Sequence, residues 1–174
     1  MWLILLLCIP FAIWAVWYTE HSKKVADSKE CFEGEEKHNA DVSLIASHIC
    51  GLPLGEKSEC KLFLASEKII IESQSSIFKL DKNKILDVSL KTSKEVQNSI
   101  SGAVGGAMLL GAIGAFIGGS DTKLRMFLIF IYDSNEEKKC ISFEVENIGD
   151  RCTKARKFVE DFKNSVTEKK EIEL

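Results

Sequence analysis

Histidine and cysteine are the side chains of this sequence that could bind a metal ion or attack a substrate. The chain has three histidines, at positions 21, 38 and 48, and six cysteines. His48, Cys50 and Cys60 lie in one stretch, but a histidine two residues before one thiol and twelve before another does not match zinc-site spacing. We therefore predict a packed histidine and two buried thiols, and keep an enzyme that uses these residues as an alternative hypothesis.

Other signatures of catalysis are absent from the sequence. It contains no P-loop, HExxH, GxSxG, CxxC or GxGxxG motif. The paired carboxylates Glu35/Glu36 and Glu136/Glu137 lie in polar segments, which indicates solvated surface. We expect a protein that is not an enzyme, with no catalytic, cofactor-binding or metal-binding residue, no cofactor and no small-molecule substrate.

The overall charge argues against a nucleic-acid partner. In 174 residues the chain has 23 Lys and Arg and 26 Asp and Glu, for a formal net charge of -3, and it has no dense basic stripe. Domains that bind nucleic acid usually carry a basic surface of that kind. The charges are also unevenly placed, because none precedes Glu20 and none lies between Val96 and Ser120.

The first uncharged segment, residues 1–18, reads MWLILLLCIPFAIWAVWY. As a helix it would reach about 27 Å, close to the ~30 Å hydrocarbon core of a bilayer. Trp14, Trp17 and Tyr18 at its downstream end suit a membrane interface, and we take them as candidate interface anchors. A cleaved signal peptide is the alternative, but no basic side chain precedes the apolar stretch. The segment predicts a transmembrane helix.

The flanking charges predict the orientation of this helix. His21, Lys23, Lys24 and Lys29 follow the apolar segment, and only the terminal amine precedes it. Positive flanks tend to stay inside, so we expect a single-pass protein of the cell membrane whose main domain is cytoplasmic. Residues 19–40 are polar and of mixed charge with little apolar periodicity, so we expect a tether there.

The second uncharged segment lies in residues 99–120 and holds seven of the eleven glycines. Small residues recur there at every fourth position, which lets helices approach closely in lipid. A single crossing would separate the strands on its two sides, so we expect a hairpin that reaches about one leaflet. The candidate residues for contact with the bilayer or with sister subunits are Gly102, Gly106, Leu109, Leu110, Gly111, Gly114, Phe116 and Gly118.

Strand patterns fill most of the charged parts of the chain. They occur at residues 60–65, 68–72, 76–80, 85–91, 124–132 and 140–146. Alternation such as Ile141, Phe143 and Val145 predicts an antiparallel sheet with one buried face. Residues 124–132 are apolar on both faces, so either GLPLG at 51–55 or the glycine-rich insert must cover the outer side. In the latter case the insert would belong to a soluble core.

A terminal helix completes the pattern. Residues 150–166 carry one apolar stripe, formed by Cys152, Ala155, Phe158, Val159, Phe162 and Val166. We expect this helix to cap a small curved antiparallel sheet or partial barrel, which makes the fold α+β. Residues 167–174 form a charged tail.

One long run of the sequence resembles a known domain family. HICGLPLGEKSECKLFLASEKIIIESQSSIFKLDKNKILDVSL, followed by the glycine-rich loop, two strands and a helix, is similar to bacterial pleckstrin-homology-like (PH-like, or GRAM-like) domains of many Firmicutes proteins. In these, a segment like His48-x-x-Gly51-Leu52-Pro53-Leu54 leads into the first barrel strand, and a phrase like Lys84-Ile85-Leu86-Asp87-Val88 marks a later one. The resemblance covers residues 46–165 and implies a PH-like β domain over residues 41–166.

The resemblance carries fold more than function. Phosphoinositide-binding members of the wider fold use a cluster of Lys and Arg between the first two strands. The corresponding loop here is expected to offer only Ala65, Ser66, Glu67 and Lys68, so inositide binding there is disfavoured.

Two hypotheses from different classes remain beside the enzyme. The first is a non-catalytic, membrane-anchored interaction or adaptor module whose PH-like domain binds a protein or lipid partner. In it, the glycine-rich hairpin contacts the membrane or sister subunits. The second is a self-assembling envelope component that oligomerises through the glycine-rich segment.

Overall fold

An antiparallel sheet of seven strands organises the chain in the computed structural model, which describes residues 2–102, 113–114, 125–147 and 150–170. The side chains of residues 2–13 are outside this description. In chain order the elements are α1 (Trp2–His38), β1 (Ala40–Cys50), β2 (Glu59–Ala65), β3 (Lys68–Ser73), β4 (Ile77–Asp81), η1 (Lys82–Lys84), β5 (Ile85–Thr92), α2 (Ser93–Gly102), β6 (Met126–Ser134), β7 (Glu137–Val145) and α4 (Arg151–Lys170). The expected α+β class with a C-terminal helix is confirmed.

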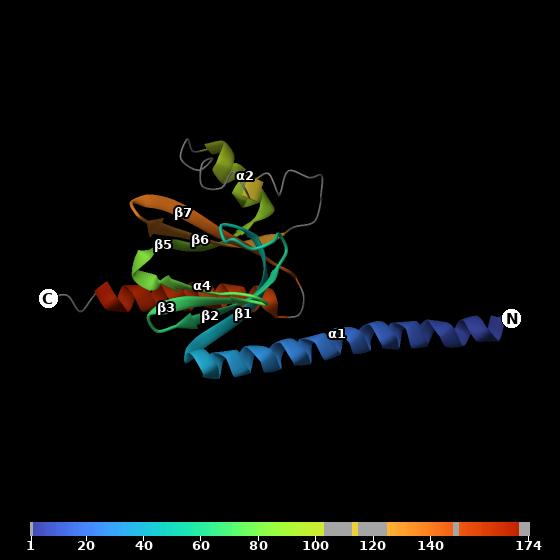
Figure 1. Cartoon of the computed structure of the whole chain (residues 1–174). Coiled ribbons are helices and arrows are strands. Elements are labelled where there is room, and N and C mark those ends of the chain that lie inside the picture. The colour runs from blue at the N-terminus through green and yellow to red at the C-terminus, as the bar shows by residue number, and fades with distance from the viewer. Residues whose placement is uncertain (1, 103–112, 115–124, 148–149, 171–174) are drawn as a thin grey trace.

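The sheet is built from two meanders that share β1. Its strand order is β4-β3-β2-β1-β7-β6-β5, so β4 and β5 are the edges. β1 pairs with both β2 and β7, and its register to β7 shifts between His48 and Cys50. In Figure 1 the two halves of the sheet lie as two layers with α4 between them. The strand patterns predicted a small curved antiparallel sheet or partial barrel capped by a helix. The structure has a capped antiparallel sheet, and this sheet is open.

The main core lies on the concave side of the sheet, under α4. Phe158 and Phe162 of α4 are buried there against side chains from both meanders. Phe130 makes edge-on ring contacts with Phe143 and Phe158, at centroid distances of 6.0 and 6.2 Å. The predicted apolar stripe of the terminal helix is therefore confirmed, and the helix extends four residues beyond the predicted end, to Lys170.

The six predicted strands correspond to β2 through β7. The loop expected between the last two is shorter than predicted, because β6 runs to Ser134 and β7 starts at Glu137. Asn135 and Glu136 between them have φ of 57° and 67°, as in the tight turns that suit the twist of a hairpin. In residues 85–91, Leu86, Val88 and Leu90 alternate with polar side chains, which predicts that all three are buried. Leu86 is nevertheless exposed, because the register of β5 to β6 shifts between Ile85 and Asp87.

The first strand was missed by the sequence analysis. β1 is buried on both faces, so it lacks the alternation that marks a half-buried strand. Consequently His48 and the GLPLG segment come at the end of the first strand and after it, and do not lead into it. The loop of Ala65 to Lys68 joins β2 to β3, and the loop between β1 and β2 is residues 51–58.

α1 continues without a break to His38, so the prediction of a polar tether at residues 19–40 is wrong. Its last turns pack on the outer face of β1 and β2, where Cys31 and Gly34 are buried. A Cβ at Gly34 would collide with the ring of Phe63, so only glycine lets the helix approach this closely. Asn39, with φ of 47°, then ends the helix and turns the chain into β1.

Ion pairs hold the same part of α1 to the body of the fold. The carboxylate of Asp27 lies 2.7 Å from the guanidinium of Arg151 in α4, and that of Glu30 lies 2.7 Å from the ammonium of Lys61 in β2. Arg151 is buried and also pairs with Glu146 at 3.0 Å. The helix upstream of this contact projects away from the sheet (Figure 1). In the described part of the chain, no helix combines the length and hydropathy of a membrane span.

The outer face of β6 is covered as the sequence requires. Phe127 and Ile129 are buried against Ile49, Val96 of α2 and Ile113 of the glycine-rich insert. Of the two candidates for this cover, the insert therefore contributes through Ile113. Leu52 and Leu54 of the GLPLG segment pack against the concave core instead.

Candidate interaction groove between β5 and α4

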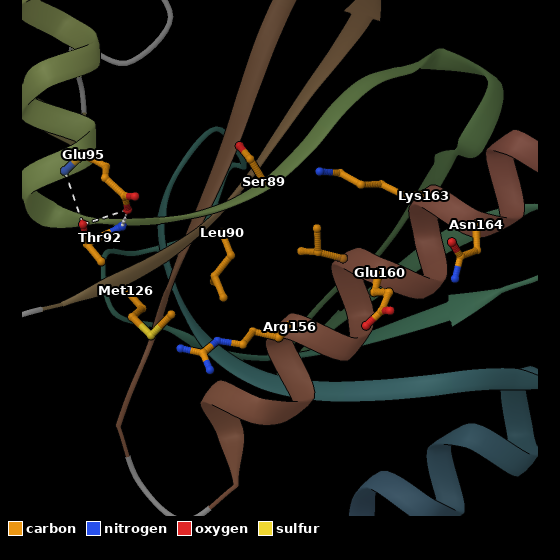
Figure 2. Close-up of a pocket in the computed structure, with 10 residues that line it drawn as sticks. Ser89, Leu90, Thr92, Glu95, Met126, Arg156, Glu160, Lys163 and Asn164 are labelled. Atoms are coloured by element: carbon orange, nitrogen blue, oxygen red, sulfur yellow. Dashed lines mark hydrogen bonds between the residues drawn. The ribbon is translucent and has the colours of Figure 1, made fainter.

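A groove of about 600 Å³ runs between the edge strand β5 and the terminal helix α4 (Figure 2). It is lined by Ser89, Leu90, Thr92, Glu95, Met126, Arg156, Val159, Glu160, Lys163 and Asn164. The lining thus comes from β5 and β6 at one end of the sheet, from the start of α2 and from the middle of α4.

The floor of the groove is apolar and rigidly placed. Leu90, Met126 and Val159 are partly buried and pack against the concave core. Thr92 of β5 lies opposite Met126 of β6 in the antiparallel register, so the two strands fix one side of the floor. The apolar stripe of α4 fixes the other side, through Val159.

A capping box at the start of α2 contributes Thr92 and Glu95 to the lining of the groove (Figure 2). The Thr92 backbone N–H and hydroxyl donate to Glu95 Oε2 at 2.7 and 2.8 Å, and the Glu95 N–H donates to Thr92 Oγ1 at 3.3 Å. The bond from the Thr92 N–H, followed by that from its hydroxyl, lowers the pKa of Glu95. The carboxylate of Glu95 is therefore engaged in holding the helix start.

Two cations of α4 face the strands across the floor. Figure 2 shows Lys163 extending toward Ser89 and Leu90, and Arg156 extending toward Met126. Glu160 and Asn164 point away from the strands. Arg156 and Lys163 are exposed, and neither side chain has an ion pair or hydrogen bond with another described residue. The groove therefore presents, beside an apolar floor, two positive charges that no described side chain pairs with.

A second hollow, of about 300 Å³, lies between α1 and β2–β3, and its charges are paired. Lys61 is bonded to Glu30, which raises the pKa of Lys61. Glu72 accepts from Lys37 and from His38, both at 2.8 Å. Burial alone would raise the pKa of Glu72, but these two hydrogen bonds lower it. This hollow belongs to the interface that holds α1.

The histidine and cysteines singled out in the sequence do not form a reactive set. His48 is buried, its Nε2 accepts from the Leu52 N–H at 3.2 Å, and its Nδ1 donates to the Gly55 carbonyl at 3.3 Å. Both ring nitrogens thus hold the loop after β1, which fixes the neutral Nδ1–H tautomer. Cys50 lies 3.2 Å from the Ser142 hydroxyl, and no group of three or more potential metal ligands occurs among the described residues.

The buried thiol of Cys60 and the partly buried thiol of Cys140 are also poor nucleophiles at neutral pH. Burial, together with the nearby Glu59 carboxylate, raises the pKa of Cys60 to about 11. Burial and the neighbouring Cys50 raise the pKa of Cys140 to about 12. A thiol attacks as its thiolate, so these shifts act against the chemistry that a catalytic cysteine needs.

Most of the glycine-rich candidate contacts lie outside the described residues. These are Gly106, Leu109, Leu110, Gly111, Phe116 and Gly118. Gly102 is the last residue of α2, and Gly114 follows the buried Ile113. The three interface candidates lie together on α1: Trp14, Trp17 and Tyr18 are 54%, 57% and 55% exposed, and the Trp14 and Tyr18 rings stack at 5.5 Å.

The groove was not predicted from the sequence, although two signals for it were present. Thr92-x-x-Glu95 directly after a strand pattern is a capping box and marks the start of a helix. Arg156 and Lys163 lie seven residues apart beside the apolar stripe of α4, on nearly the same face. The groove also requires that β5 lies close to α4. This depends on the three-dimensional fold, and neither sequence signal predicts it.

The comparisons with known proteins leave the groove as the main guide to function. The chain matches no model of a known protein family, and it matches no curated protein.

Proposed function

We propose that this protein is a non-catalytic, membrane-anchored interaction module that binds a partner protein in the groove between β5 and α4. The groove carries the proposal, since it combines an apolar floor, a strand that lies at the edge of the described sheet and two cations without a partner among the described residues. Binding sites commonly pair an apolar surface with a few polar groups that fix orientation. The one described hydroxyl–carboxylate pair in the lining, Thr92 and Glu95, forms the capping box that holds the start of α2, so we propose binding and not chemistry.

We assign the domain to the PH-like type as part of this proposal. Two meanders that meet at β1, with the terminal helix packed inside the curved sheet, fit the architecture that the sequence resemblance implies. The first strand, Ala40–Cys50, begins one residue before the predicted start of the domain at 41 and six residues before the start of the resemblance at 46.

The anchor in the proposal is the apolar segment 1–18. Its sequence has no charged side chain, and the exposed aromatic cluster of Trp14, Trp17 and Tyr18 would lie at the bilayer interface. The main domain would then be cytoplasmic, as the downstream lysines favour. Because Ile113 packs on the sheet, we place the described part of the insert on the domain and not in the bilayer.

Site-specific photo-cross-linking tests the interaction. A benzophenone amino acid is placed at Ser89, in the groove, in the full chain within its native cells. The matched control carries it at Lys79, on the opposite edge strand β4. We expect a discrete protein adduct from position 89 that is absent from position 79. Equal adducts from both positions, or none from 89, would contradict the proposal.

Self-assembly remains a second candidate because of α1. Tyr18, Val25 and Phe32 of this helix are 55%, 57% and 66% exposed and recur every seven residues. Residues seven apart lie on one face of a helix, and exposed apolar side chains on one face are what a second helix can pack against. Sedimentation of the full chain, and of a variant with Val25→Glu and Phe32→Glu, decides it: an assembly that the variant loses would favour self-assembly.

A further inference from the structure

The open edge of β5 forms one wall of the groove. In the described sheet β5 pairs only with β6, so the main-chain groups on its other side have no strand partner there. An extended chain can add to such an edge through main-chain hydrogen bonds, with side chains that enter neighbouring pockets. The groove between β5 and α4 offers the pockets as well as the edge.

The charged side chains beside the edge of β5 determine whether an acidic or a basic ligand is favoured. Arg156 and Lys163 are exposed, reach across the floor and have no described partner, whereas Glu95 is engaged by Thr92. Glu160 lines the groove but points away from the strands (Figure 2). The hydrogen bonds from Thr92 leave the negative charge of Glu95 in place at the start of α2, whereas Arg156 and Lys163 are the charges that extend across the floor toward the strands. We take these two cations as the charges that a bound chain meets, and they complement acidic side chains.

The spacing of the two cations fits an extended backbone. Seven residues of helix separate Arg156 from Lys163, which is about 10.5 Å along the axis. Side chains on one face of a strand recur every second residue, at about 7 Å, and every fourth, at about 13 Å. Two acidic residues four positions apart can reach both cations, with the residue midway between them over Leu90, Met126 and Val159.

On the basis of the proposed function, we infer that the groove takes an extended segment of the partner protein with the pattern acidic-x-apolar-x-acidic. The segment adds as a strand to β5. Its two carboxylates meet Arg156 and Lys163, and its apolar side chain enters the floor between them. No bond is made or broken, so recognition depends on main-chain pairing, apolar contact and charge.

A peptide titration tests this inference. The probe is a fluorescent eight-residue peptide with the centre Glu-Thr-Leu-Thr-Glu, and its counterpart replaces both glutamates by lysine. Fluorescence anisotropy with the full chain in detergent should show binding of the acidic peptide only. Arg156→Glu combined with Lys163→Glu should weaken that binding by about tenfold or more.

A matched control separates the groove from general charge. Lys79→Glu combined with Lys157→Glu changes the net charge equally, and both lysines are exposed outside the groove lining. This control should bind the acidic peptide like the wild type. Thermal unfolding of all variants checks that each is folded. If the variant with Arg156→Glu and Lys163→Glu does not fold, Arg156→Gln combined with Lys163→Gln takes its place.

N-methylated peptides test the strand addition itself. Alternate amides of an added strand face the sheet, so N-methylation of one alternate set should abolish binding and of the other set should leave it. Equal effects of the two sets would overturn strand addition. Equal binding of the acidic and basic peptides, or an unchanged affinity of the groove double variant, would overturn acidic recognition.

Other occupants of the groove give different results. If the groove double variant loses self-association and no peptide binds, the occupant is a second copy of this chain. If it loses binding to phosphatidylglycerol vesicles instead, the occupant is an anionic lipid surface. Either result overturns the inference. An adduct from position 89 with a partner that lacks acidic segments would overturn it while sustaining the proposed function.

Discussion

At the scale of single residues, the fold uses its polar and reactive side chains as structural pieces. Both ring nitrogens of His48 form hydrogen bonds with the loop after β1. Gly51 in that loop has φ of 99°. A Cβ at Gly51 would also meet the backbone of Cys140 and Ile141. The residues that looked most reactive in the sequence therefore fix the point where β1 crosses from one meander to the other.

The thiols give a direct test of the catalytic alternative. With pKa values raised to about 11 and about 12, Cys60 and Cys140 are protonated at neutral pH. We expect iodoacetamide to modify both far more slowly in the native protein than after unfolding in guanidinium, as followed by mass spectrometry. Modification of either thiol in the native protein faster than free glutathione would instead support an enzyme.

Gly34 should be the residue of α1 least tolerant of a side chain. Alanine usually stabilises a helix by about 1 kcal/mol relative to glycine, but here its Cβ would press on the buried ring of Phe63. We expect Gly34→Ala to lower the free energy of unfolding by about 1–2 kcal/mol in urea titrations. In a Phe63→Leu background the same change should be neutral or stabilising, and an equal loss in both backgrounds would contradict this contact.

Glu72 should make the hold on α1 sensitive to acid. Its pKa is lowered from 4.5 because hydrogen bonds from Lys37 and His38 outweigh the effect of burial. Stability from this group is present above its unfolded pKa and is lost as the pH falls through its lower folded pKa. Urea titrations from about pH 5 to about pH 3 should show a smaller loss of stability for Glu72→Gln than for the wild type.

The control for this prediction is Glu36→Gln, which changes an exposed carboxylate of α1, the helix that Glu72 of β3 holds through Lys37 and His38. It should follow the wild-type pH dependence. If Glu72→Gln loses stability in acid as steeply as the wild type, the pairing with Lys37 and His38 does not contribute.

At the scale of elements, α1 has a C-terminal part that packs on the sheet and an upstream part that does not. Its last turns are part of the domain, with Cys31 buried and Asp27, Glu30 and Lys37 in ion pairs. Upstream of Asp27, most of its described side chains are exposed. The packed part of α1 therefore begins near Asp27, upstream of the domain start predicted at residue 41.

Two truncations test this boundary. Removal of residues 1–38 would expose Phe63 and Ile70, which are now buried under α1, and should cost about 3–6 kcal/mol of stability. Removal of residues 1–25 should leave the stability of the domain nearly unchanged in urea titrations. Equal stability of the two truncated proteins would show that α1 does not cover the sheet.

The elements also show what the sequence can and cannot predict. The strands with a polar face and the terminal helix were predictable, because their apolar spacing follows the geometry of the element. β1 has no polar face, and the α1 interface uses a cysteine and a glycine, so neither left an apolar period. The double-sided strand β6 predicted that a cover exists, but only the fold identifies Val96 and Ile113 as its parts.

At the scale of the whole molecule, the proposed anchor is joined to the groove by rigid parts. α1 is one helix from Trp2 to His38, and Arg151 links its Asp27 to the start of α4. If segment 1–18 spans the bilayer, Asp27 lies about 14 Å beyond Tyr18 along the helix. The domain, and with it the β5–α4 groove, would then be held close to the membrane surface in a fixed orientation.

Co-flotation tests the central claim, a membrane-anchored module that binds through its groove. Full-length protein reconstituted in phosphatidylcholine vesicles is centrifuged through a density gradient with the fluorescent acidic peptide. We predict that protein and peptide float together. The chain without residues 1–18 should leave both at the bottom, and the double variant at Arg156 and Lys163 should float without peptide. Peptide that stays at the bottom while wild-type protein floats would contradict the groove, and wild-type protein that stays at the bottom would contradict the anchor.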